Sequence, residues 1–400
     1  MILGIDHLIN NKSLLSKLKG ARIALLANQA SVNANMQHSL KILDDCREIN
    51  LVAAFGPQHG MKSNNQDNMI ESDNYIDPVL KIPIFSLYGK VRRPTSTMMD
   101  AFDVLIIDIQ DLGVRFYTYI TTVLYLLEAC NDSGKPVWIL DRPNPIGRPI
   151  EGTILEKGWE SFVGPIPMPA RYGLTIGELA KYFTEVKVLD VDLRIVQMLD
   201  YKPELAPGYG WPVHELSWVN PSPNASSLNM ARAYPGTVLF EGTTLSEGRG
   251  TSNPLEMIGA PDIDFYLVLN SMKKLAPDWL QGCTLRLCHF EPVFDKYTGK
   301  LCYGIQIHTD NSSYNHKLFK PYRLAALILK VIRLEYPEYQ IWRDFYFEYE
   351  KNRLAIDLLS GGTFLRNWVD DSSKTIQDFE EKLNNDEQEW KQTIKPFLNY

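Results

Sequence analysis

The segment VLIIDIQDLGVRFYTY, residues 104–119, decides the fold that we expect for this chain. It begins with an uninterrupted apolar run and turns polar at Asp108, Gln110 and Asp111. An amphipathic stretch over residues 119–133 follows directly. A short apolar run that leads through polar residues into a helical pattern is typical of a strand buried on both faces and followed by a helix. The segment therefore predicts one strand–helix unit of an α/β sheet.

The same alternation recurs through the first half of the chain. Strands are expected at residues 22–27, 51–55, 84–87, 104–109, 137–140 and 193–198. Helices are expected at residues 37–48, 119–133 and 175–184. Thr175 and Glu178 have the spacing of a capping box that opens the last of these helices. Strands that alternate with helices in this way favour a parallel sheet with helices on both faces.

After about residue 200 the pattern changes. Residues 202–223 are rich in Pro, Gly and Trp, and they predict a long linker or a loop that shapes a site. Helices are then expected at residues 265–275, 321–335 and 373–394, and strands at residues 284–290 and 301–308. We therefore predict a first domain over residues 1–205 and a second, smaller α+β domain over residues 206–400.

Polar residues follow the expected strands at the points where the strands end. They are Asn28, Gln29, Gln58, His59, Asp108, Gln110, Asp111, Asp141, Arg142 and Asn144. In an open parallel sheet the ligand crevice lies beyond the carboxyl ends of the strands, so a site is expected there. The first strand is followed by ANQASVN and not by a glycine-rich phosphate loop, which argues against a nucleotide cofactor.

The overall charge argues against nucleic acid as a partner. With 41 basic and 48 acidic residues the net charge is −7, and the basic residues form no tract. No apolar run of about 18 residues is present, so no membrane-spanning helix is expected. Residues 1–20 lack the apolar region of a secretory signal, and the five cysteines are expected to be buried free thiols. These features predict a cytoplasmic protein.

The segment YPGTVLFEGTTLSEGRGTSNPLEMIGAP, residues 234–261, combines charged and hydroxyl side chains with several glycines. Glycine lets the backbone approach a ligand closely, so Glu241 and Arg249 are candidates for binding a small polar molecule. The apolar run at residues 237–240 predicts a strand that ends at Glu241, whose carboxylate is then either a structural acceptor or a ligand contact. Glu247 lies beside a glycine and is expected to be solvated.

Further candidates have a structural alternative. Glu71 in QDNMIESD can act as a general acid if its surroundings raise its pKa, or it can be an exposed side chain in a flexible connection. Asp108, Asp111 and Arg115 can form an internal salt-bridge lattice that only holds a loop. His59 has no second histidine at ligand spacing, so no metal site is expected.

The motifs, taken together, resemble one family of bacterial enzymes. They are GPQHG, QDNMIESD, PIFSLYG, DIQDLGVRFYTY, LDRPNPIGR, PMPARYGLTIGELA, WVNPSPN and YPGTVLFEGTTLSEGRGT. In this order and spacing they are similar to those of the exo-β-N-acetylmuramidases. These glycoside hydrolases release N-acetylmuramic acid (MurNAc) from the non-reducing end of peptidoglycan fragments. The resemblance covers essentially the whole chain.

The resemblance implies a Rossmann-like N-terminal domain against a smaller α/β domain, with the active cleft at their interface and no cofactor. Glu71 matches the proposed catalytic acid of the family, and Glu241 matches the Glu of its FEGT motif. Gln58 and Tyr172 depart from the PEHG and RHG sequences of many relatives, which bears on the details of substrate recognition. The candidate substrate-binding residues are His59, Asp108, Asp111, Arg115, Tyr119, Asp141, Arg142, Asn144, Arg171, Asn224, Arg249 and Thr251.

A glycosidase needs a proton donor, for which Glu71 is the candidate, and stabilisation of an oxocarbenium-like transition state. The second carboxylate is either Glu241 or one of Asp108 and Asp111. It would hold a water molecule or orient the acetamide group of the substrate as an internal nucleophile. The sequence leaves this choice open, together with the stereochemical outcome and the oligomeric state.

The lactyl carboxylate of MurNAc calls for a cationic clamp, for which Arg115, Arg142 and Arg249 are candidates because a guanidinium group binds a carboxylate through two hydrogen bonds. Two other functions stay open. One is a muropeptide- or sugar-binding protein without catalysis. The other is a metal-dependent hydrolase or phosphatase built on His59 and the two aspartates of residues 104–119.

Overall fold

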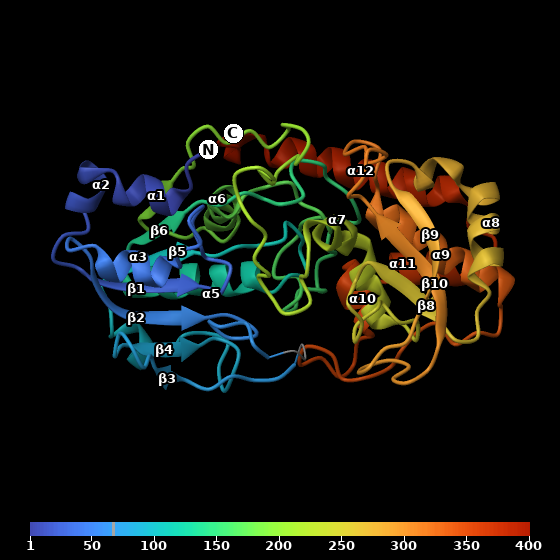
Figure 1. The fold of residues 1–400 in the computed structure, drawn as a ribbon, viewed down its shortest axis with the longest axis horizontal. Coiled ribbons are helices and arrows are strands. Elements are labelled where there is room, and N and C mark those ends of the chain that lie inside the picture. The colour runs from blue at the N-terminus through green and yellow to red at the C-terminus, as the bar shows by residue number, and fades with distance from the viewer. Residues whose placement is uncertain (66–68) are drawn as a thin grey trace.

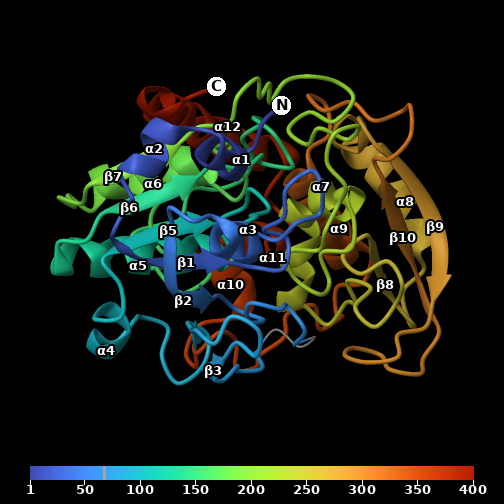
Figure 2. The ribbon, with the colours of Figure 1, turned by 60° about the vertical axis from the view of Figure 1, so that its left-hand side comes forward.

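The computed structural model describes residues 1–65 and 69–400, which contain two separate sheets. In Figure 1 the larger sheet, β1–β7, lies on the left and the smaller sheet, β8–β10, on the right. Figure 2 shows the same separation after a turn of 60°. The strands of the larger sheet fall within residues 22–196 and those of the smaller sheet within residues 257–308. The expected α/β fold with a second, smaller domain is confirmed, and the boundary at residue 205 stays a prediction.

The larger sheet has seven strands in the order β3-β4-β2-β1-β5-β6-β7. All neighbouring strands pair in parallel except β3 and β4, which pair antiparallel. The strands are β1 (Arg22–Ala27), β2 (Asn50–Gly56), β3 (Tyr75–Ile76), β4 (Pro83–Ser86), β5 (Val104–Asp108), β6 (Val137–Leu140) and β7 (Leu193–Val196). The parallel sheet is therefore confirmed, while the short strand β3 was not expected.

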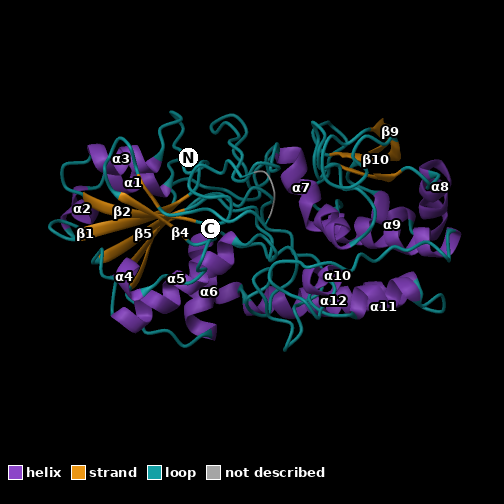
Figure 3. Cartoon of the chain, turned by 90° about the horizontal axis from the view of Figure 1, so that it is seen from below, coloured by secondary structure: helices purple, strands orange, loops and turns teal. Residues whose placement is uncertain are grey.

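Helices cover both faces of this sheet. Successive side chains of a strand point to opposite faces, and in this sheet both sets of side chains are apolar, so both faces have to be covered. In β1, Ile23 and Leu25 belong to one buried apolar cluster, and Ala24 and Leu26 belong to another. Figure 3 shows α1 and α3 on one face of the sheet and α5 and α6 on the other. The helices of this part are α1 (Gly4–Ile9), α2 (Lys12–Ser16), α3 (Ser39–Asp45), α4 (Ser96–Met99), α5 (Tyr119–Ser133) and α6 (Ile176–Val186).

The second part packs helices against a three-stranded antiparallel sheet of order β8-β10-β9. Its strands are β8 (Met257–Ala260), β9 (Thr284–Phe290) and β10 (Cys302–His308). Its helices are α7 (Leu228–Thr237), α8 (Phe265–Leu275), α9 (Pro321–Glu335), α10 (Ala355–Ser360), α11 (Phe364–Asp370) and α12 (Ile376–Thr393), with the 3₁₀ turns η1 (Val238–Gly242), η2 (Pro277–Leu280) and η3 (Lys395–Phe397). The predicted helices α8 and α9 and the predicted strand β9 are confirmed at their expected bounds.

The prediction of a strand at residues 237–240 is wrong. Helix α7 extends to Thr237 and continues directly into the 3₁₀ turn η1. At Gly236 a Cβ atom would lie only 1.9 Å from the carbonyl oxygen of Pro321, so α7 packs closely against the start of α9. The apolar residues of η1 are buried by this packing, because tertiary contacts override the local preference for a strand.

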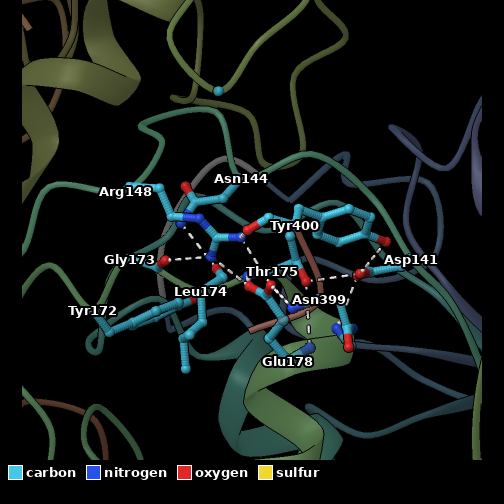
Figure 4. A network of polar contacts seen from close by, with 12 residues as sticks. Asp141, Asn144, Arg148, Tyr172, Gly173, Leu174, Thr175, Glu178, Asn399 and Tyr400 are labelled. Carbon is cyan, nitrogen blue, oxygen red and sulfur yellow. Dashed lines mark hydrogen bonds and ion pairs between the residues drawn. The ribbon is translucent and has the colours of Figure 1, made fainter. Parts of the chain in front are cut away.

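A buried polar network surrounds the N-terminus of α6 (Figure 4). Thr175 and Glu178 form the expected capping box. Arg148 donates to both carboxylate oxygens of Glu178, at 2.6 and 2.8 Å. The hydroxyl of Thr175 also donates to Asp141, at 2.7 Å. The backbone N–H of Gly177 donates to Asp141 and that of Glu178 donates to Thr175, so the network supplies acceptors for N–H groups that have no partner within the helix.

The C-terminus of the chain returns to this network. Helix α12 runs along the top of the molecule in Figure 1, and η3 packs against α6. The backbone N–H of Asn399 donates to Glu178 at 2.7 Å, and the hydroxyl of Tyr400 donates to Asp141 at 2.9 Å. The last residues of the second part of the chain therefore stabilise a helix of the first part.

We expect Asp141→Asn to lower the free energy of unfolding by about 2–3 kcal/mol, because a buried acceptor is replaced by an amide N–H that faces hydrogen-bond donors. Asp141 accepts from the backbone N–H of Gly177 and from the hydroxyls of Thr175 and Tyr400. Urea unfolding measures the change. Asp190→Asn, at an exposed position, is the control, and equal stability of the two variants would contradict the assignment.

Candidate active site

A pocket lies where the carboxyl ends of the parallel strands meet the second part of the chain. Its polar lining includes Gln58, His59, Tyr117, Thr118, Tyr119, Ser222, Asn224, Tyr234, Glu241, Arg249 and Glu348. Gln58 follows β2 and Tyr119 opens α5, whereas Glu241 lies in η1 and Glu348 shortly before α10. The expected crevice beyond the strand ends is therefore present, and we call it the central pocket.

A larger cavity adjoins the central pocket. It has a volume of about 500 Å³, which falls within the roughly 300–1,000 Å³ of small-molecule sites. Glu241, Arg249 and Phe347 line both spaces. The other lining residues are Met69, Ile70, Glu247, Phe294, Asp295, Arg343 and Phe345. We call this space the outer cavity. Its wall combines aromatic rings with both signs of charge.

Four charged side chains, three of them buried and that of Lys296 partly buried, form a chain of ion pairs beside the outer cavity. Arg249 pairs with Glu241 and, at 3.2 Å, with Glu247. Lys296 pairs with Glu247 at 2.6 Å. Burial raises the pKa of Glu241, and the guanidinium group of Arg249 opposes this shift. Burial also opposes ionisation of Glu247, but Lys296 and Arg249 together lower its pKa.

The expectation that Glu247 is solvated is wrong, because its side chain is only 1% exposed. Gly248 and Gly250 have φ angles of +77° and +80°, and they turn the loop so that Glu247 and Arg249 both face inward. Lys296, from the loop between β9 and β10, then covers Glu247. Because Lys296 is far from Glu247 in the sequence, the residues next to Glu247 do not predict that its side chain is buried.

Glu71 lies at the rim of the site. Its carboxylate accepts hydrogen bonds from Arg92 and Tyr349, both at 3.2 Å, and its side chain is half exposed. The preceding residues Met69 and Ile70 line the outer cavity together with Glu241. Glu71 and Glu241 thus flank the same region, and their catalytic roles stay predictions. The first residues of the QDNMIESD motif, 66–68, lie outside the described part of the chain.

Three other predicted binding residues line the central pocket: His59, Tyr119 and Asn224. The ring of His59 contacts the carbonyl oxygen of Asn65 at 2.7 Å. Tyr119 donates to the carbonyl oxygen of Pro221 at 2.7 Å. Both contacts fix loops that border the pocket.

Several predicted binding residues lie outside both spaces and are bonded to protein groups. Arg142 forms a fully buried ion pair with Asp108. Asp111 accepts from Tyr172, and burial raises the pKa of Asp111 to about 6. Asn144, seen in Figure 4, donates to the carbonyl oxygen of residue 174 at 2.9 Å, and Asp141 belongs to the same network. These contacts hold loops in place, but their partners differ from the expected lattice of Asp108, Asp111 and Arg115, because Asp108 pairs with Arg142 and Asp111 bonds to Tyr172.

The other arginines of the prediction bind backbone carbonyl oxygens. Arg115 donates to the carbonyl oxygens of residues 153 and 168, at 3.0 and 2.8 Å, and of residue 359, at 2.7 Å. Arg171 donates to the carbonyl oxygen of Ile146. Thr251 donates to the carbonyl oxygen of Gly248 at 2.6 Å and lines a separate shallow hollow. Of the three proposed lactyl clamps, only Arg249 lines the central pocket and the outer cavity.

Arg343 and Glu348 are among the charged residues of the site that sequence reasoning missed. Both lie in the segment IWRDFYFEYE, residues 341–350, whose many aromatic residues are typical of a hydrophobic core. The only local signal is the alternation of charged residues with aromatic ones, which does not distinguish a site from a packed surface.

Among the described residues, no group of three or more His, Cys, Asp or Glu side chains is arranged to hold a metal ion. The five cysteines are free thiols, but the expectation that all of them are buried is wrong, because Cys46 and Cys283 are only partly buried. None of the helices in residues 1–65 and 69–400 is long and apolar enough to cross a membrane.

Comparison with known proteins identifies the family. Residues 23–229 match the family model described as exo-β-N-acetylmuramidase NamZ, N-terminal, and residues 232–400 match the corresponding C-terminal model. The chain belongs to the NamZ family of exo-β-N-acetylmuramidases. It is 38% identical over 402 residues to the peptidoglycan β-N-acetylmuramidase NamZ of Bacillus subtilis strain 168, covering 99% of this chain and 91% of that protein.

Solved structures that are similar to this chain share its fold. Two crystal structures of DUF1343 family proteins from Bacteroides fragilis NCTC 9343 superpose with TM-scores of 0.84 and 0.74, at 28% and 27% sequence identity. Each comparison covers 100% of this chain and 98% of the other. The family predicted from the sequence motifs is therefore confirmed. The predicted enzyme class, a glycosidase, is confirmed as well.

We expect Lys296→Met to lower the free energy of unfolding by about 3–5 kcal/mol, because it leaves the buried carboxylate of Glu247 without its closest cation. Lys296 also donates to the carbonyl oxygens of residues 240, 243 and 245, so the loop loses three further contacts. Thermal or urea unfolding measures the loss. Lys300→Met, at an exposed position of the same loop, should be nearly neutral, and similar losses in both variants would refute the argument.

Proposed function

We propose that this chain is an exo-acting β-N-acetylmuramidase that binds the terminal MurNAc of a peptidoglycan fragment in the outer cavity and the central pocket. The observation that carries the proposal is the match of both halves of the chain to the NamZ family, with a cavity enclosed by residues of both halves. A substrate held between the two parts would contact each of them.

The wall of the outer cavity suits an amino sugar with an acidic arm. Phe294, Phe345 and Phe347 offer apolar faces for the C–H surfaces of a sugar ring. Arg343 lines the same wall, and its guanidinium carbon lies 4.2 Å from the ring centre of Phe345. No carboxylate of the described residues lies within 4.0 Å of Arg343, whereas Arg249 is paired twice. Arg343 is therefore the better candidate for the lactyl carboxylate.

Glu241 has the position and chemistry of the second carboxylate. It is buried, it lines both spaces, and Arg249 stabilises its ionised form. An ionised carboxylate beside the sugar can accept a hydrogen bond from the acetamide N–H or from the attacking water, and it can stabilise an oxocarbenium-like transition state. Both roles use the same acceptor oxygens.

We expect the purified protein to hydrolyse a chromogenic MurNAc glycoside. It should also release MurNAc from MurNAc–GlcNAc, in which MurNAc is the non-reducing sugar, and it should leave GlcNAc–MurNAc intact. Chromatography of the products with the two disaccharides measures both substrate and direction. Failure to cleave any MurNAc substrate would refute the function. Calorimetric binding without turnover would indicate a binding protein, and activity lost to a chelator and restored by a divalent ion would indicate a metal-dependent hydrolase.

We expect Arg343→Met to reduce kcat/KM for the MurNAc glycoside about 10- to 100-fold, because a charge-assisted contact to the lactyl carboxylate is lost. The GlcNAc glycoside lacks the lactyl group and is the internal control. The variant should therefore narrow the preference for MurNAc over GlcNAc. An equal loss on both glycosides would show that Arg343 does not recognise the lactyl carboxylate.

A further inference from the structure

Glu348 carries a carboxyl group that no motif of the sequence predicts. The residue is 5% exposed, and it reaches from the segment before α10 into the carboxyl edge of the parallel sheet. Gln58 donates to its Oε1 atom at 2.9 Å, and the hydroxyl of Tyr88 donates to its Oε2 atom at 2.9 Å. Each oxygen of the carboxyl group is thus held by a side chain from the other part of the molecule.

The backbone at this carboxyl group has an uncommon conformation. Glu348 and Tyr349 have φ angles of +45° and +71°, in the left-handed region that L-residues rarely occupy. Such conformations persist where the surrounding structure enforces them, and they cluster at functional sites. Here the guanidinium carbon of Arg92 lies 3.1 Å from the ring centre of Tyr349, and Tyr349 donates to Glu71. These contacts fix the side chain of Glu348 toward the pocket.

Glu348 lies at the junction of two spaces. On one side it lines the central pocket together with Glu241 and Arg249. On the other side it lines an open groove whose wall includes the cationic side chains Arg92 and Arg93. Lys90, Tyr125, Phe162, Lys187 and Tyr349 also line this groove. If the terminal sugar of a saccharide is bound in the central pocket and the outer cavity, the second sugar can lie in this groove.

The surroundings of Glu348 favour a carboxyl group that keeps its proton near neutral pH. Burial raises its pKa to about 7, and the negative charge of Glu241 adds to this shift. The hydrogen bonds from Gln58 and Tyr88 and the positive charge of Arg92 oppose it. A general acid is most effective when its pKa lies near the working pH.

We propose that Glu348 is the proton donor of the glycosidase reaction, acting on a glycosidic oxygen bound beside its side chain, with the sugar to be released on the side of the central pocket and the leaving saccharide on the side of the groove. The O–H bond of Glu348 breaks as an O–H bond forms on the glycosidic oxygen. The C1–O bond breaks with its electron pair moving to that oxygen, and the remaining saccharide leaves as an alcohol. Water then supplies the hydroxyl group at C1, and its remaining proton restores the carboxyl group. This inference rests on the proposed function.

The test compares Glu348→Gln with the unmodified protein on two MurNAc substrates. On the disaccharide MurNAc–GlcNAc, whose leaving group needs a proton, kcat/KM should fall about 100- to 10,000-fold. On 2,4-dinitrophenyl MurNAc, whose leaving group departs as a stable anion, kcat/KM should fall less than about tenfold. Equal losses on both substrates, or retained cleavage of the disaccharide, would overturn the assignment.

The pH profile is an independent readout. Because Glu348 must be protonated to act, activity on the disaccharide should decline as the pH rises above about 7, where its pKa lies. This alkaline limb should be absent in Glu348→Gln. In Glu348→Asp, which keeps a proton on an intrinsically stronger acid, the limb should move to lower pH, and an unmoved limb would overturn the proposal. The Asp variant also decides the matter if the Gln variant does not fold.

Two control variants sharpen the result. Glu338→Gln, at an exposed position on the surface, should behave as the unmodified protein. Glu71→Gln tests the donor expected from the sequence. If Glu71→Gln and not Glu348→Gln shows the selective loss on the disaccharide, Glu71 is the donor and the proposal is wrong. If the unmodified protein cleaves neither MurNAc substrate, the proposed function itself fails.

Discussion

The buried pairing of Arg249 with Glu241 and Glu247 is the interaction on which the site depends. Buried carboxylates are costly unless cations compensate them, and Lys296 completes the compensation from another loop. This requirement fixes the glycine-rich loop in one conformation. In this conformation the carboxylate of Glu241 lines the outer cavity, which is large enough for a sugar.

The two parts of the chain are connected at more than one place. At the site, Glu348 from the second part bonds to Gln58 and Tyr88 of the first. At the N-terminus of α6, the hydroxyl of Tyr400 from the second part donates to Asp141 of the first part. Because the contacts of Glu348 are buried and that of Tyr400 is partly buried, the cavity between the parts has walls of defined geometry. Such rigidity is what positioning of a glycosidic bond against acid and carboxylate requires.

The sheet places its site at the edge where related α/β folds bind nucleotides, although the chain lacks a phosphate loop. The residues after β1 are held inward instead: the side chain of Asn28 donates to the carbonyl oxygen of Gln110 at 3.0 Å. The loops after β2 and β5 and the segments of the second part form the pocket. The same carboxyl edge therefore serves carbohydrate chemistry, because function is determined by the loops and not by the sheet.

The sequence alone determined the parallel sheet, the longest helices and the family, because apolar periodicity and motif order are local properties of the chain. It also proposed Glu241 and Arg249, which both line the central pocket and the outer cavity. It did not distinguish Arg115, which binds backbone carbonyls, from Arg343, which faces the cavity. Only the tertiary structure decided this, and only it brought Glu348 to the strand ends, because burial and charge pairing depend on residues far apart in sequence.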